Sequence, residues 1–182
     1  MQVKGTLLMD YVRMLRSAKG KNWSQWLTPA DLEIIQSKIL PSQWYPYETM
    51  QRIGLAIFKE LANSDLNLVR AFGKFMARNL AKVYQQVIIA GDPISSVEKI
   101  VAIQRTLFKD TGSGGRIIER SEKRFTFEIT AEAGINQPEA AAAAGHQTAG
   151  VLEGIIELAG GKNVKTEIRE KGEGFDLRFS WE

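Results

Sequence analysis

One stretch near the C-terminus constrains the fold of this chain most, because residues 138–160 read PEAAAAAGHQTAGVLEGIIELAG. Proline favours the first turn of a helix and a glycine pair favours its end, so we expect one long helix from Pro138 to Gly160. Each glycine inside a helix costs about 1 kcal/mol relative to alanine. Their spacing places Gly150 and Gly154 on one helix face, which predicts a helix or strand packed tightly against that face. Room for a ligand is the alternative.

The hydrophobic pattern changes character along the chain. Five segments before residue 110 show the period of a helix, beginning near Gly5, Pro29, Pro46, Asp65 and Pro93. After a glycine- and serine-rich segment at 111–116, apolar and polar residues alternate in two predicted hairpins, at 116–130 and 164–181.

These elements predict an α/β (α+β) fold, with an N-terminal helical layer of about five helices on a four-stranded antiparallel sheet. The C-terminal half is a hairpin-helix-hairpin. We expect a single domain over residues 1–182, with a helical part at 1–110 and the hairpin-helix-hairpin part at 115–182.

The fourth predicted helix has two contrasting sides. Its apolar residues predict a buried face: Leu68, Phe72, Phe75, Met76, Leu80 and Val83. The other side carries a basic residue at every fourth position, which we call the basic ridge: Arg70, Lys74, Arg78 and Lys82. Like charges repel at this spacing, and no acid separates them. The basic ridge is either a solvated face or a docking surface for an acidic protein partner or an anionic ligand.

Composition and charge narrow the class of protein. The chain has 182 residues, 44% apolar and 25% charged, which is ordinary for a globular domain. Residues 1–90 carry a net charge of +6 and residues 91–182 a net charge of −3, so the two halves can attract each other within one molecule or between molecules. Because the two halves can pair across a two-fold axis, we expect a homodimer. No arginine-rich run accompanies the basic half, which argues against nucleic-acid binding. No run approaches the roughly 20 apolar residues of a membrane span, so we expect a cytoplasmic protein.

Few residues are available for chemistry. The absence of cysteine excludes disulfides, thiolate nucleophiles and zinc-thiolate sites. The only histidine, His146, has no serine positioned beside it by the sequence. The glycine-rich segment lacks the lysine and hydroxyl residue of a phosphate-binding loop. We therefore expect no enzyme activity, no metal site and no cofactor.

Two groups of segments resemble known families. Three N-terminal segments resemble an uncharacterised bacterial family of myxobacterial-type paralogues, most specifically at residues 44–46. These segments are GTLLMDYVRML, SQWYPYETMQRIGLAI and FGKFMARNLAKVYQQV. The glycine-containing helix, the pair at 160–161 and the final FDLRFSW resemble 4-vinyl-reductase-type domains. Relatives of the latter are the heme-nitric-oxide-binding domains and trafficking-complex subunits. The resemblance implies helices on a small antiparallel sheet, often with an apolar pocket, and in several branches a dimer.

The sequence departs from the heme-binding branch. That branch needs a proximal histidine ahead of its sheet and a tyrosine, serine and arginine motif for the heme propionates, and this sequence shows neither. His146 lies in a different element, between the two hairpins. The cysteines typical of 4-vinyl-reductase-type domains are also absent.

The sequence thus predicts a noncatalytic sensor or adaptor module of bacterial signalling or regulation that binds a small hydrophobic ligand, a protein partner, or both. The candidate ligand pocket combines strand aromatics with the long helix: Phe125, Phe127, His146, Gly150, Gly154, Phe175, Phe179 and Trp181. The alternatives are a structural or oligomerisation protein with a filled core, and an enzyme or heme-type sensor using His146.

Overall fold

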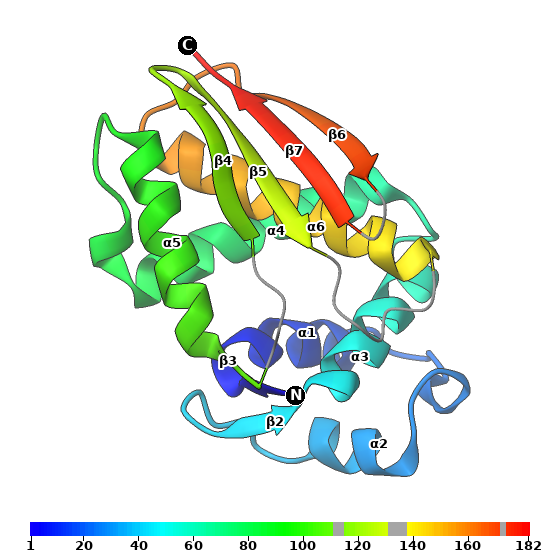
Figure 1. The fold of residues 1–182 in the computed structure, drawn as a ribbon. Coiled ribbons are helices and arrows are strands. Elements are labelled where there is room, and N and C mark those ends of the chain that lie inside the picture. The colour runs from blue at the N-terminus through cyan, green and yellow to red at the C-terminus, as the bar shows by residue number, and fades with distance from the viewer. Residues whose placement is uncertain (111–114, 131–137, 172–173) are drawn as a thin grey trace. The chain divides into compact units, whose positions relative to one another are not determined.

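A computed structural model describes residues 1–110, 115–130, 138–171 and 174–182 (Figure 1). The chain divides into two compact units: unit 1 comprises Met1–Asp65 and Thr106–Thr111, and unit 2 comprises Leu66–Arg105 and Gly112–Glu182. The first division therefore follows residue 65, whereas the hydrophobic pattern changes near residue 110. Most of the glycine-rich segment and the tip of the last predicted turn, residues 111–114 and 172–173, lie outside the described residues.

Unit 1 combines short strands with three α-helices and a 3-10 helix at Trp23–Gln25. Its elements are β1 (Gln2–Lys4), α1 (Gly5–Ser17), α2 (Pro29–Gln36), β2 (Trp44–Pro46), α3 (Tyr47–Glu60) and β3 (Phe108–Lys109). The α-helices agree with the sequence prediction. The strands form an antiparallel sheet in the order β2-β1-β3, which the sequence did not predict. Strands of two or three residues are too short to show an alternating pattern.

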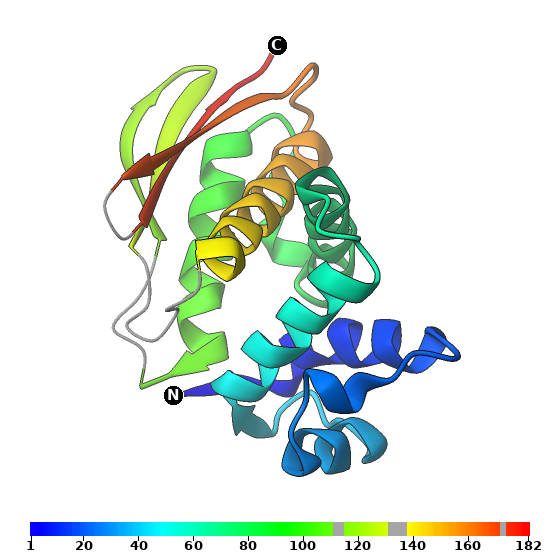
Figure 2. The ribbon, with the colours of Figure 1, turned by 90° about the vertical axis from the view of Figure 1, so that its right-hand side faces the viewer.

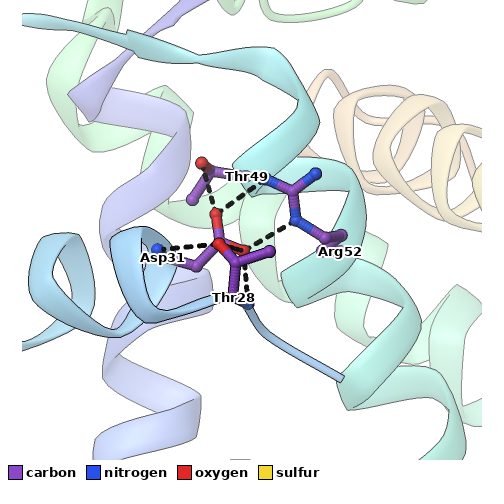
Figure 3. A network of polar contacts seen from close by, with 4 residues as sticks. All are labelled: Thr28, Asp31, Thr49 and Arg52. Carbon is purple, nitrogen blue, oxygen red and sulfur yellow. Dashed lines mark hydrogen bonds and ion pairs between the residues drawn. The ribbon is translucent and has the colours of Figure 1, made fainter. Parts of the chain in front are cut away.

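A buried carboxylate joins α2 to α3 (Figure 3). Asp31, 1% exposed, accepts hydrogen bonds from the Thr49 hydroxyl at 2.7 Å and from Arg52 Nε at 2.7 Å. It also closes a capping box with Thr28, whose backbone N–H and hydroxyl donate to Asp31. Burial alone would raise the pKa of Asp31, but the hydrogen bonds from Arg52, Thr49 and Thr28 outweigh it and hold the pKa far below its ordinary value.

Unit 2 holds the larger sheet. Its elements are α4 (Leu66–Val83), α5 (Pro93–Leu107, whose last two residues belong to unit 1), β4 (Gly115–Ser121), β5 (Arg124–Thr130), α6 (Pro138–Leu158), β6 (Lys165–Lys171) and β7 (Gly174–Ser180). All strand pairs are antiparallel, in the order β4-β5-β7-β6. The predicted hairpin-helix-hairpin and the α+β class are confirmed. Gly160, with a φ of +106°, follows α6 in the left-handed conformation that glycine tolerates.

The elements of unit 2 form layers. α5 and α6 cover one face of the four-stranded sheet, and α4 lies on the side of α6 away from the sheet (Figures 1 and 2). Between sheet and helices lies an apolar core that includes Phe127, Leu177 and Ile155. The opposite face of the sheet carries charged side chains, as the alternating pattern predicts.

Candidate functional site

The closest approach between helices in unit 2 is that of α4 and α6. A Cβ atom added to Gly150 would collide with the carbonyl oxygen of Arg70, and one added to Gly73 would collide with that of Gln147. At Gly154 an added Cβ would lie 2.6 Å from the Ala77 methyl carbon. This confirms the predicted close packing on the glycine face of α6. Helix α4 fills the space beside Gly150 and Gly154 that the ligand alternative requires.

A charged cluster crosses this helix pair. Glu153, 2% exposed, accepts hydrogen bonds from Arg70 Nη2 on α4 and from the Thr166 hydroxyl on β6. Lys74 Nζ lies 3.4 Å from the other Glu153 oxygen and 2.7 Å from Glu157 Oε1. We call these five residues the Glu153 cluster. It ties α4, α6 and β6 together.

The charges within the Glu153 cluster favour its ionised form. Burial would raise the pKa of Glu153, but the hydrogen bonds from Arg70 and Thr166 and the nearby positive charges lower it. Burial would likewise lower the pKa of Lys74, but its carboxylate partners raise it. Both groups therefore carry their charges at neutral pH.

The basic ridge is not one exposed surface. Arg70 and Lys74 turn toward α6, where acids of the C-terminal half neutralise them. These two residues are therefore paired within the chain rather than fully solvated, and docking of a partner or an anion on the basic ridge stays a prediction. The attraction between the basic and acidic halves occurs here within a single chain. Arg78 and Lys82 remain exposed.

The apolar side of α4 also differs from the prediction. Leu68, Phe75 and Val83 are 51%, 46% and 62% exposed, whereas Met76 is buried as predicted. The small residues of α4 face α6, because only glycine and alanine allow the two backbones to approach so closely. Larger apolar side chains cannot fit at this contact, so α4 is rotated relative to the prediction.

His146 lies on the α4 side of α6, one turn before Gly150. Its Nδ1 atom is buried and has no hydrogen-bond partner within the described part of the chain. Burial and the positive charge of Arg70 lower the pKa of His146, and Glu153 opposes them only in part. The imidazole is therefore neutral at pH 7. The hydroxyl of Thr166 donates to Glu153, so the cluster contains no hydroxyl activated by the histidine.

The five aromatic residues proposed for the pocket lie on the other side of α6, in the core beneath the sheet: Phe125, Phe127, Phe175, Phe179 and Trp181. All are at most 9% exposed. The rings of Phe125 and Phe179 stack at 4.8 Å, and Trp181 lies 5.9 Å from Phe125. The eight predicted pocket residues are thus divided between the two sides of α6. Binding of a small apolar ligand among the aromatics stays a prediction.

The outer face of the sheet carries a groove of about 220 Å³ that the sequence did not suggest. Two of its lining acids, Glu128 and Asp176, lie directly opposite each other on β5 and β7. Lys171 Nζ lies 3.5 Å from Glu128 and 3.8 Å from Asp176. Oδ1 of Asp176 is buried without a hydrogen-bond partner in the described residues.

The residues do not fit a histidine-ligated heme. Helix α5, the last helix before the larger sheet, reads PISSVEKIVAIQRTL and contains no histidine. His146 stands beside a guanidinium, one turn from a backbone contact between α4 and α6 that leaves no gap for a porphyrin. Within the described ranges, no three acidic or histidine side chains gather as a metal site. In the same ranges, no helix has the length and apolar character needed to cross a bilayer.

Sequence reasoning missed Glu153, Glu157 and Thr166. The sequence does contain one indication that Glu153 is buried, because Glu153 immediately precedes Gly154, on the helix face that the glycines predict to be closely packed. A carboxylate there is buried and needs cationic partners. The sequence cannot say that they come from α4, 83 residues away.

Comparison with solved structures finds the fold of heme nitric oxide/oxygen binding (H-NOX) domains. A point mutant of H-NOX from T. tengcongensis matches with a TM-score of 0.65 and 12% identity, over 98% of this chain and 97% of that one. An Fe(II) unliganded H-NOX mutant from K. algicida matches with a TM-score of 0.62 and 16% identity, over 98% and 96%. An oxygen-binding H-NOX domain related to soluble guanylate cyclases, in its oxygen complex, matches with a TM-score of 0.62 and 12% identity, over 98% and 95%.

At these identities the similarity establishes the fold. It confirms the resemblance to the heme-nitric-oxide-binding branch at that level. No protein-family model and no curated protein matches the sequence, so the resemblance to the myxobacterial-type family stays a prediction.

Proposed function

We propose that this chain is a noncatalytic signalling module of the H-NOX fold that works without heme and acts by contact with other protein chains. The observation that carries this proposal is the position of its single histidine. His146 lies on α6 beside Arg70, in an interface closed by backbone contacts, while α5 offers no histidine.

The Glu153 cluster supports a structural role for this region. Its carboxylate already accepts hydrogen bonds from Arg70 and Thr166, and the neutral imidazole of His146 has no activated hydroxyl beside it. A sensor that bound heme through His146 would have to separate α4 from α6 and break these contacts. We therefore place the function of this module on its surfaces rather than in the α4–α6 interface.

Heme loading tests the proposal directly. The protein is produced in cells supplied with a heme precursor, purified, and examined by absorption spectroscopy and native mass spectrometry, with an H-NOX protein that binds heme treated in parallel. We expect no Soret band at one heme per chain and a mass equal to that of the polypeptide or a multiple of it. A stoichiometric Soret band that disappears in His146→Ala would contradict the proposal.

The same native spectra test the small-ligand prediction. A constant additional mass of a few hundred daltons, released by organic solvent, would support a ligand among the core aromatics and a sensor role. If the mass is that of the polypeptide alone, the adaptor interpretation is favoured.

A further inference from the structure

An exposed apolar strip runs along α4. Three of the six large apolar side chains that are exposed in the described residues belong to it: Leu68, Phe75 and Val83. The ring of Phe72 stacks on that of Phe75 with centroids 6.4 Å apart. We call these four residues the α4 strip. Such a concentration on one helix is typical of an interaction surface.

The spacing of the α4 strip fits a helix as its occupant. Within the α4 strip, Leu68, Phe72 and Phe75 follow one another at intervals of four and three residues, and Val83 lies eight residues beyond Phe75. This is the spacing with which one helix packs along another in a coiled coil. A partner helix would cover the strip from Leu68 to Val83, over about four turns.

The strip is complementary to itself. Phe75 lies near the middle of α4, Leu68 lies seven residues before it, and Val83 lies eight residues after it. If two copies pack antiparallel about a two-fold axis at Phe75, Leu68 of each copy comes within about 1.5 Å of the level of Val83 in the other. An interface on a two-fold axis requires this kind of match.

The charges beside the strip select the antiparallel arrangement. Arg78 and Lys82 are exposed, and neither has an ion pair among the described residues. A parallel pair would place each of them beside its own copy, and like charges would repel. In the antiparallel pair, Arg78 reaches the level of Phe72 in the second copy, where a cation can lie over the aromatic ring.

We propose that the α4 strip is a homodimer interface in which two α4 helices pack antiparallel about a two-fold axis at Phe75. The inference uses only unit 2 and does not depend on the heme-free function. One helix pair is at the small end of specific interfaces, so we expect a reversible dimer with a dissociation constant of about 10 µM.

Sedimentation velocity over a wide concentration range gives the first test. The unmodified chain should pass from monomer to dimer, and Phe75→Glu should raise the dissociation constant at least about tenfold, because it places a charge at the centre of the interface. Leu158→Glu is the matched control: Leu158 is a leucine 42% exposed at the end of α6, outside the strip. Circular dichroism of Phe75→Glu and of the milder Phe75→Ser shows that each remains folded.

Disulfide trapping gives the arrangement of the helices, because the chain has no cysteine of its own. Phe75→Cys should form a covalent dimer under mild oxidation, since the two residues meet on the axis. Leu68→Cys should not link to itself but should link to Lys82→Cys when the two variants are mixed. Leu158→Cys should remain monomeric.

Three results would overturn the proposal. A monomer at all concentrations would show that the α4 strip does not bind a second copy. A dimer unchanged by Phe75→Glu would place the interface elsewhere. Self-linkage of Leu68→Cys would contradict the antiparallel arrangement.

Discussion

Asp31 in unit 1 and Glu153 in unit 2 are two buried carboxylates with similar hydrogen-bond partners, but these partners lie at different distances along the sequence. They are 1% and 2% exposed, and each accepts hydrogen bonds from an arginine and from a threonine hydroxyl. In both cases these bonds outweigh burial and lower the pKa. The arginine of Asp31 is 21 residues away, whereas that of Glu153 is 83 residues away.

The two sites also differ in how completely the carboxylate is satisfied. Both oxygens of Asp31 accept hydrogen bonds, from Arg52 Nε and Nη2 and from threonines. In Glu153, Arg70 and Thr166 share Oε1, and among the described residues the other oxygen has only Lys74, at 3.4 Å. Asp31 therefore has one donor, Thr28, at the start of its own helix, whereas these three partners of Glu153 all come from other elements, α4 and β6.

Removing the arginine of Glu153 should have the largest effect. We expect Arg70→Met to lower the free energy of unfolding of unit 2 by about 3 kcal/mol, because a buried carboxylate is left with Lys74 as its one remaining cation among the described residues. Urea denaturation followed by circular dichroism measures the change, and hydrogen exchange in α4 and α6 locates it. Arg78→Met, on the same helix but exposed and without an ion pair in the described part of the chain, should change the free energy by less than about 0.5 kcal/mol.

A double variant sharpens this result. Replacing both partners, as in Arg70→Met with Glu153→Leu, removes the unpaired charge and should restore much of the lost stability. If the double variant is as unstable as the sum of the two single variants, Arg70 and Glu153 are not energetically coupled and the comparison with Asp31 does not hold.

Removing the arginine of Asp31 should cost less. We expect Arg52→Met to destabilise unit 1 by about 1 kcal/mol, because Asp31 keeps its hydrogen bonds from Thr28 and Thr49 and the Arg52 side chain is 39% exposed. Hydrogen exchange in α2 and α3 reports on this unit. An effect larger than that of Arg70→Met would reverse the order of the two sites. Arg13→Met, at an exposed i,i+3 ion pair with Asp10, is the control.

This difference in sequence separation explains which features could be predicted from the sequence. Thr28 and Pro29 stand next to each other before an apolar helical pattern, so the start of α2 followed from neighbouring residues. The ends of α6 and the alternation of β5 and β7 are equally local. The sequence therefore predicted the helices, the hairpins and the class of fold.

The candidate site required information that the sequence lacks. The basic ridge does lie on one helix, α4, as its spacing predicts. Spacing along one helix, however, does not say which side of that helix contacts α6. That choice is made by Gly73 and Ala77, which let α4 approach Gly150 and Gly154. The larger apolar side chains were then left exposed. The short strands β1 to β3 were missed because their pairing, rather than any pattern, defines them.

The pH dependence of the free energy of unfolding should report on His146, which lies near Glu153. The pKa of His146 is lowered in the folded state, so the unfolded chain binds more protons as the pH falls through about 6.5, the ordinary value for histidine. The stabilising effect of the neutral imidazole is complete above that pH and is lost below it. Between about pH 7.5 and pH 5 the free energy of unfolding should therefore fall, by less than about 1.4 kcal/mol per pH unit.

His146→Gln should remove this dependence, because His146 is the only histidine and faces only Arg70 and Glu153 among the charged groups that shift its pKa. Urea denaturation of both proteins across this pH range measures it. An equal slope in the variant would mean that another group titrates there.

Asp176 is a third buried carboxylate, and one of its oxygens, Oδ1, accepts no hydrogen bond from the described residues. It is 9% exposed, Lys171 Nζ is 3.8 Å from Oδ2, and Arg169 lies opposite it on β6. Glu128 lies directly opposite it, and hydrogen bonding to Arg116 holds the pKa of Glu128 below its ordinary value, so that acid is ionised at pH 7. Two acids opposite each other on neighbouring strands destabilise a sheet.

Asp176→Asn should therefore stabilise unit 2, whereas removing the arginine partner of Asp31 or Glu153 is expected to destabilise the protein. We expect a gain of about 0.5 kcal/mol, because asparagine keeps the shape of the side chain and removes the charge facing Glu128. Thermal unfolding measures it, and the gain should shrink at high salt, which screens the repulsion. Glu170→Gln on β6, which lies opposite Phe175, lacks an acidic cross-strand neighbour and should show no such gain. Destabilisation by Asp176→Asn would mean that this carboxylate, like the other two, has favourable partners, and that burial of a carboxylate in this fold always comes with its donors.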